Sequence, residues 1–169
     1  MLIVDVVQGV PFAKVKHDNI IQFFDDDAKL HTAVKVSGEQ CDGVLFLTDR
    51  PPSFSRATIF WVCDDMRPLW RQDIMLEFPD AMLLRKEFSQ LRDGHKPKMG
   101  DLTIQHDGTT LLLANPYSSA RYVDMRTGKT VPPDDTARTA FLVVSQWEVV
   151  VPTTDKATTS LAEFPEAAK

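Results

Sequence analysis

The apolar residues of this chain occur in short runs that end at turn-forming residues, and this spacing limits what the chain can fold into. Runs of about four to eight residues favour strands, whereas helices need longer periodic segments. Turn clusters such as Gly9-Val10-Pro11 and Asp49-Arg50-Pro51-Pro52 separate the runs. The first part of the sequence therefore predicts strands at Leu2–Val7, Phe12–Lys16, Ile20–Phe24, Leu30–Val36, Val44–Thr48 and Ala57–Cys63. The apolar run at Ile20–Phe24 fits a helix equally well.

One segment has the periodicity of a helix instead. Four apolar residues recur at intervals of three or four and would form a single stripe: Ala81, Leu84, Phe88 and Leu91. Asp80 suits the N-cap of such a helix, and Gly94 suits the left-handed residue that ends it. The sequence therefore predicts a helix over 81–92, with its apolar stripe covering a sheet.

Two hairpins are predicted in the second half. Asp107-Gly108 is typical of a two-residue type I′ turn, which would place Ile104 opposite Leu111. A second hairpin is predicted from Tyr122 to Val131, with Gly128 at a positive φ and Val123 opposite Val131.

The continuous apolar run within Thr139–Val151 predicts one long strand near the centre of the sheet, ending at Pro152. After this strand the composition becomes polar. We therefore expect one globular domain over 1–151 and a polar tail over 152–169, in which Ser160–Glu163 fits a single helical turn.

Together these elements predict an α+β fold that is predominantly antiparallel β, either a sandwich or a partly open barrel, with one main helix packed on the sheet. The length of 169 residues fits a single domain that can bury a sufficient core without a metal or disulfide.

Charge and hydropathy narrow the classes of partner and location. The net charge of −5 repels polyanions, so the sequence argues against nucleic acid or an anionic membrane as the partner. No apolar run is long enough to cross a bilayer. The residues after Met1 do not form a secretory leader, so we expect a cytoplasmic protein.

Cys41 and Cys63 are the only cysteines, and 21 residues lie between them. This spacing fits neither a C-x-x-C redox motif nor a zinc site. We therefore expect two buried thiols that stay reduced.

No motif assigns a metal, a cofactor or a reaction. Asp25-Asp26-Asp27, with His31 nearby, lacks the alternate acids of a calcium loop and is expected to be a solvated turn. The glycine patterns that bind dinucleotides or phosphates and the G-x-S-x-G nucleophile motif do not occur. We therefore expect neither a metal nor a cofactor.

The residue types enriched at protein interfaces are concentrated in two segments. The first contains Met66, Arg67, Leu69, Trp70 and Arg71, and the second contains Tyr117, Arg121 and Tyr122. The sequence therefore favours a protein-binding module, such as an adaptor, an inhibitor or immunity-type partner, or a subunit of a larger assembly. Self-association stays open. The alternative is a small hydrolase or isomerase-like barrel enzyme with a pocket of Asp, His and Arg.

Overall fold

The computed structural model describes residues 9–48, 56–63, 75–86, 89–90, 97–114, 120–131 and 140–164. These residues form three antiparallel sheets, and the longest helix within them is the 3-10 turn η1 at Phe12–Lys14. The described part of the chain is therefore all-β, and the expected α+β fold with a main helix is wrong. It also contains no helix long and apolar enough to span a membrane.

The first sheet has five strands in the order β4-β3-β2-β1-β5. They are β1 (Ile20–Phe24), β2 (Leu30–Ser37), β3 (Asp42–Phe46), β4 (Ile59–Trp61) and β5 (Leu76–Phe78). Strands β1 to β4 pair with their neighbours in sequence, as in a meander. The predicted strand at Ile20–Phe24 is confirmed, and the next three are present with changed bounds.

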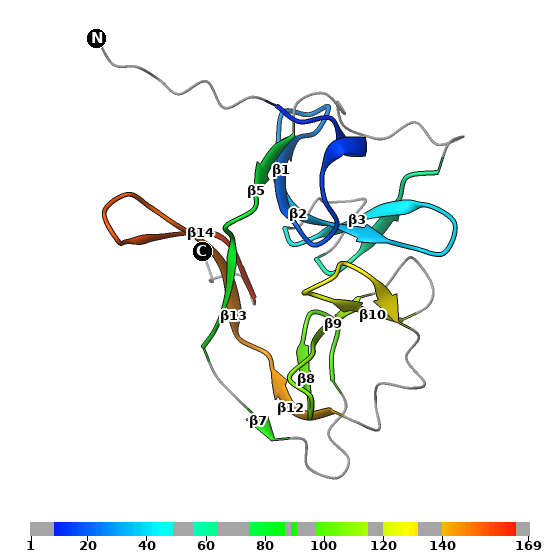
Figure 1. The fold of residues 1–169 in the computed structure, drawn as a ribbon, viewed down its shortest axis with the longest axis vertical. Coiled ribbons are helices and arrows are strands. Elements are labelled where there is room, and N and C mark those ends of the chain that lie inside the picture. Colours follow the sequence, from blue (N-terminus) through cyan, green and yellow to red (C-terminus); the bar gives the residue numbers. More distant parts are fainter. Residues whose placement is uncertain are drawn as a thin grey trace.

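The second sheet has six strands in the order β11-β10-β9-β8-β12-β7, and the third has three in the order β14-β13-β6. The second sheet contains β7 (Ser89–Gln90), β8 (Leu102–Gln105), β9 (Thr110–Ala114), β10 (Arg121–Asp124), β11 (Thr130–Val131) and β12 (Ala140–Val144). The third contains β6 (Met82–Arg85), β13 (Trp147–Pro152) and β14 (Thr158–Phe164). In Figure 1 the first sheet lies above the second, and the third lies beside them.

The main core contains buried side chains from all three sheets. They are Val34, Val36, Leu45 and Ile59 of the first, Leu102, Ile104, Leu112 and Val123 of the second, and Trp147, Val149, Ala162 and Phe164 of the third, among others. A second cluster, which includes Phe23, Ala33 and Phe46, covers the opposite face of the first sheet. Strand β2 is consequently buried on both faces along most of its length.

The segment before β1 covers this second cluster. The strand expected at Phe12–Lys16 is instead η1, and the strand expected at Leu2–Val7 lies outside the described residues. Lys35 on β2 holds the segment in place, because its Nζ donates to the carbonyl oxygens of Phe12 at 3.0 Å and Val15 at 2.9 Å. These bonds satisfy the ammonium group of a residue that is only 2% exposed.

The predicted helix over 81–92 is wrong, because its first turn is strand β6, which pairs with β13. Burial follows a period of two: Ala81 and Leu83 pack against the main core, whereas Met82 and Leu84 are exposed. A helical stripe would have buried Leu84, which is 40% exposed. Pairing and burial have therefore overridden helix propensity. Apart from β7, the later half of the segment lies outside the described residues.

The predicted hairpin at Asp107-Gly108 forms with a register one residue away from the expected one. Ile104 lies opposite Thr110 rather than Leu111. The turn has three residues, and Gly108 takes the positive φ of +86° that such a loop requires. Leu112, and not Leu111, therefore joins Ile104 in the main core.

The second hairpin also forms with a register shifted by one residue, since Val123 lies opposite Thr130 rather than Val131. Gly128 has the predicted positive φ, at +67°. A Cβ atom there would lie 2.6 Å from the backbone nitrogen of Asp18. This close approach is a second reason for glycine, which the sequence did not reveal.

The long strand predicted at Thr139–Val151 is two strands in two sheets. Strand β12 ends at Val144 and β13 begins at Trp147, and the exposed residues Ser145 and Gln146 separate them. Figure 1 shows the chain passing directly from one strand to the other. Each strand has a neighbour on both sides, so the expected interior position holds for both halves.

The segment after Pro152 contains β14 in place of the helical turn expected at Ser160–Glu163. Strand β14 pairs with β13, with a bulge next to Val149. Ala162 and Phe164 are each 7% exposed and belong to the main core. Their alternate spacing is the pattern of a strand with one buried face.

Candidate functional site

Most of the interface residues predicted from the sequence lie outside the described part of the chain. These are Met66, Arg67, Leu69, Trp70, Arg71 and Tyr117. Arg121 and Tyr122 are described and begin β10. Arg121 is half-buried, whereas Tyr122 is only 5% exposed and contributes little surface.

The structure brings a different set of residues together in an open groove of about 560 Å³. One wall is the inner face of β6, which contributes Leu83 and Arg85. The other wall consists of the turns of the two hairpins and the adjoining ends of β9 and β10, which together contribute Asp107, Gly108, Thr109, Thr110, Asp124, Met125, Arg126 and Thr127. We call this surface the β6 groove.

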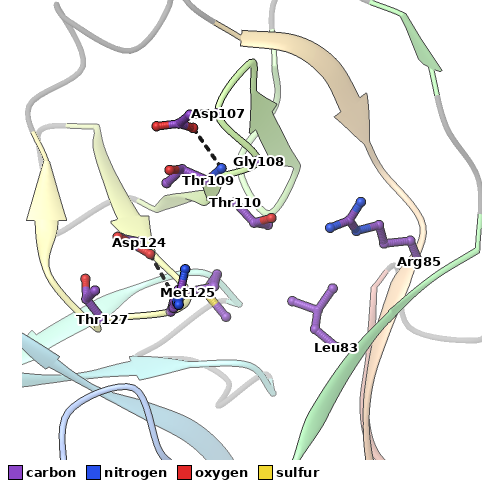
Figure 2. A pocket seen from close by; sticks show the side chains of 10 residues that line it. Leu83, Arg85, Asp107, Gly108, Thr109, Thr110, Asp124, Met125 and Thr127 are labelled. Carbon is purple, nitrogen blue, oxygen red and sulfur yellow. Dashed lines mark hydrogen bonds between the residues drawn. The ribbon is translucent and has the colours of Figure 1, made fainter.

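Figure 2 shows the side chains of Leu83 and Arg85 projecting from β6 toward the turns across the groove. Thr110 and Met125 lie on the opposite wall, and the backbone N–H of Met125 donates to the carbonyl oxygen of Thr110 at 3.0 Å. The groove therefore combines apolar side chains with the guanidinium groups of Arg85 and Arg126 and several threonine hydroxyls.

The two carboxylates of the groove stabilise their own turns. Asp107 accepts a hydrogen bond from the backbone N–H of Thr109 at 2.9 Å, and Asp124 accepts one from Arg126 at 2.8 Å. The bond from the Thr109 backbone, and then the bond from its side chain, lower the pKa of Asp107. Asp107 is therefore held as an anion at neutral pH, and it is not suited to act as a general acid.

Strand β6 is also an edge strand, so part of its backbone faces away from the sheet. The N–H of Lys86 donates to the carbonyl oxygen of Gln146 at 2.9 Å, which continues the pairing of β6 with β13. Residues of an antiparallel pair alternate between facing the partner and facing outward. Leu83 and Arg85 consequently turn their N–H and C=O groups outward, and no described residue hydrogen-bonds to them.

The opposite face of β6 is apolar and exposed. Met82 is 46% exposed and Leu84 is 40% exposed. Both belong to the small group of large apolar side chains that the described residues leave exposed. An edge strand with exposed apolar side chains and unpaired backbone groups is a template for pairing with another chain.

The acidic run at Asp25-Asp26-Asp27 differs from the expected solvated turn. Asp25 is only 7% exposed, and its Oδ1 accepts the backbone N–H groups of Asp27 at 2.8 Å and Lys29 at 3.0 Å. Its Oδ2 accepts a hydrogen bond from Nε2 of the buried His31 at 2.7 Å. The rings of Phe23 and Phe46 lie against His31. The hydrogen-bonded pair of Asp25 and His31 therefore stabilises the turn between β1 and β2.

A second polar cluster joins β2, β3 and the segment before β1. Asp42 lies 2.8 Å from Nε2 of His17 and 3.2 Å from Nζ of Lys35. Burial alone would raise the pKa of Asp42, but hydrogen bonds from His17 and Lys35 and their charges lower it overall. Among the described residues no group of three His, Cys, Asp or Glu side chains is suited to hold a metal ion.

Sequence reasoning missed the β6 groove because its walls come from distant segments. The turn signals at Gly108 and Gly128 located the tips of both hairpins, but not the strand that faces them. That strand was hidden by the helical spacing of its apolar residues. Comparison of the chain with protein-family models, with curated protein sequences and with solved structures finds no match.

Proposed function

We propose that this chain is a protein-binding module that takes up an extended segment of a partner protein along the outer edge of β6. The observation that carries the proposal is the edge itself. Leu83 and Arg85 turn their N–H and C=O groups outward, and no described strand pairs with them. A partner segment that adopted a strand there would extend the third sheet by one strand.

The other edge of the same sheet provides a contrast. The carbonyl oxygen of Leu161 on β14 accepts a hydrogen bond from the hydroxyl of Thr32 on β2 at 3.1 Å. The guanidinium of Arg56 donates to the carbonyl oxygen of Glu163. Side chains of other segments thus cover backbone acceptors of β14, which blocks a new strand there.

The side chains around β6 indicate what the partner segment would contain. Successive residues of an added strand would alternate between the two faces of the third sheet. On the groove face they would meet Leu83 and the guanidinium of Arg85, which suits an apolar residue and an acidic one. On the other face they would meet the exposed apolar side chains of Met82 and Leu84.

The alternative of a small hydrolase or isomerase gains no specific support from the groove. Its Asp107 and Asp124 bind backbone N–H groups of their own turns, and the pKa of Asp107 is lowered rather than raised. The net charge of −5 continues to favour a protein partner over nucleic acid or an anionic membrane.

The test uses a library of random linear peptides, selected for binding to the full chain. We expect the selected peptides to combine apolar and acidic residues at alternate positions. Bound peptide should slow hydrogen exchange at the amides of Leu83 and Arg85, because those N–H groups would become hydrogen-bonded.

A matched pair of variants at one position separates backbone pairing from charge. Arg85→Pro removes the outward N–H and should weaken peptide binding by about tenfold or more, whereas Arg85→Ala keeps the N–H and should weaken it only a few-fold. Proline is tolerated there because that N–H is not used within the sheet. Equal binding by both variants, or self-association of the chain through β6, would contradict the proposal.

A further inference from the structure

Cys41 directly precedes β3, and Cys63 lies two residues after the end of β4, so the register of these two strands, continued past its end, places the cysteines opposite each other. Strands β3 and β4 pair with a constant register in which Gly43 lies opposite Trp61. The N–H of Val62 donates to the carbonyl oxygen of Asp42 at 2.8 Å, so the pairing extends one step past the end of β4. The next step places Cys41 opposite Cys63.

The other neighbour of β3 supports this placement. The N–H of Gly38, just after β2, donates to the carbonyl oxygen of Cys41 at 3.1 Å, so Cys41 is hydrogen-bonded on the side of β3 that faces β2. In the middle strand of three, a residue bonded to one neighbour faces away from the other. Cys41 and Cys63 therefore form a non-hydrogen-bonded pair.

This kind of pair has a backbone geometry compatible with a disulfide. Its Cα atoms are about 4.5 Å apart, and disulfides span Cα distances of about 4.4 to 6.8 Å. Residues directly opposite each other also project from the same face of the sheet. No disulfide joins the two residues in this structure, and both are half-buried rather than buried as the sequence predicted.

We propose that Cys41 and Cys63 form a thiol–disulfide modification site, which closes into a cross-strand disulfide when the protein meets a small disulfide oxidant such as oxidised glutathione. The bond would tie β4 to β3 at the point where their backbone hydrogen bonds end. The site lies in the first sheet and is independent of the function proposed for β6.

The reaction balances in two exchange steps. The thiolate of one cysteine attacks a sulfur of oxidised glutathione, which forms a mixed disulfide and releases one glutathione thiolate. The thiolate of the opposite cysteine then attacks the protein sulfur of the mixed disulfide and releases the second glutathione. The protein loses two protons and two electrons, and the oxidant becomes two glutathione thiols.

The experiment incubates the folded full chain in glutathione buffers of increasing oxidised fraction, quenches exchange with an alkylating reagent, and measures intact mass and linked peptides. We expect the wild-type chain to lose the mass of two hydrogen atoms and to yield a peptide pair joined through Cys41 and Cys63. Cys41→Ser and Cys63→Ser should instead each accumulate one bound glutathione, because the second exchange step is missing.

Thermal unfolding provides an independent measurement. Oxidation should raise the melting temperature of the wild-type chain, because the cross-link restricts the unfolded chain, and should leave both serine variants unchanged or lower. The proposal is overturned if the wild-type chain retains two alkylated thiols, binds glutathione at both residues, or forms only disulfides between chains.

Discussion

The indole Nε1 of Trp147 donates a hydrogen bond to the carbonyl oxygen of Gly100 at 2.9 Å, which joins the start of β13 to the segment that leads into β8. Trp147 is fully buried, and its ring stacks on that of Phe164 with 4.2 Å between ring centres and a 5° angle between planes. The hydrogen bond therefore links the third sheet to the segment that enters the second, and the stacking joins β13 to β14 within the third sheet.

Trp147→Phe tests the contribution of that hydrogen bond. The smaller ring can still pack against Phe164, but it leaves the carbonyl of Gly100 without its partner. We expect the unfolding free energy to fall by about 1 to 3 kcal/mol because the Gly100 carbonyl loses its hydrogen bond. A further loss should come from the smaller volume of phenylalanine in the core. Chemical denaturation measures the change. Trp61→Phe is the control, since no described residue hydrogen-bonds to the indole of Trp61. An equally large loss of unfolding free energy in this variant would show that the bond from Trp147 to Gly100 does not account for the effect.

Replacing each of the two turn glycines by alanine should lower the stability of the fold by different amounts. Gly108 has φ of +86°, and a Cβ added there would meet no other atom within 4 Å, so Gly108→Ala should cost only about 1 to 2 kcal/mol for the left-handed backbone. Gly128→Ala should cost more, because its Cβ would also lie 2.6 Å from the nitrogen of Asp18 and 2.8 Å from the carbonyl oxygen of Lys35. Equal melting temperatures for the two variants would contradict this difference.

The pKa of Asp42 predicts a dependence of stability on pH. Because this pKa is lowered in the folded state, ionised Asp42 stabilises the fold above its unfolded pKa of about 3.9, and this contribution is lost as the pH falls through the folded value. Asp42→Asn should lower the unfolding free energy at neutral pH by about 1 to 2 kcal/mol. We expect a value near about 1 kcal/mol, because solvent screens the partly exposed carboxylate.

The measurement compares wild type and Asp42→Asn by urea unfolding at neutral pH and below about pH 4. The difference between the two proteins should shrink in acid, since wild-type Asp42 is then increasingly protonated. A difference that stays constant with pH would show that the charge of Asp42 does not contribute.

Adjacent acids at the tip of the first hairpin should respond differently to the same change. Asp25→Ala removes the acceptor of two backbone N–H groups and of His31, and should cost about 2 kcal/mol or more. Asp26 is exposed, so Asp26→Ala should change the unfolding free energy by less than about 0.5 kcal/mol. Similar losses for both variants would support the solvated turn that the sequence suggested.

The sequence predicted individual elements better than their pairing. The apolar run at Ile20–Phe24 fitted a strand or a helix from its sequence, and the strand alternative has the observed bounds of β1. The Asp107-Gly108 turn was found but its register was not. The same two residues fit a two-residue loop or the end of a three-residue loop, and only the packing of Leu112 decides between them.

The errors in the other elements arise from long-range pairing. The spacing of Ala81 and Leu84 fits a helix, but β13 lies beside this segment and makes it a strand. The apolar run within Thr139–Val151 predicted one strand, but Ser145 and Gln146 separate two strands that belong to two sheets. The β6 groove could not be predicted, because it depends on these pairings.

The pairing of β6 with β13 has a consequence for how the chain is made. Leu84 lies opposite Glu148, which a ribosome adds later, so neither edge of β6 is covered while residues 86–146 are being synthesised. During that interval the Met82–Arg85 segment exposes apolar residues and unpaired amides on both sides. Translation that stalls before β13 should therefore yield nascent chains that aggregate or recruit chaperones, whereas completed chains should not.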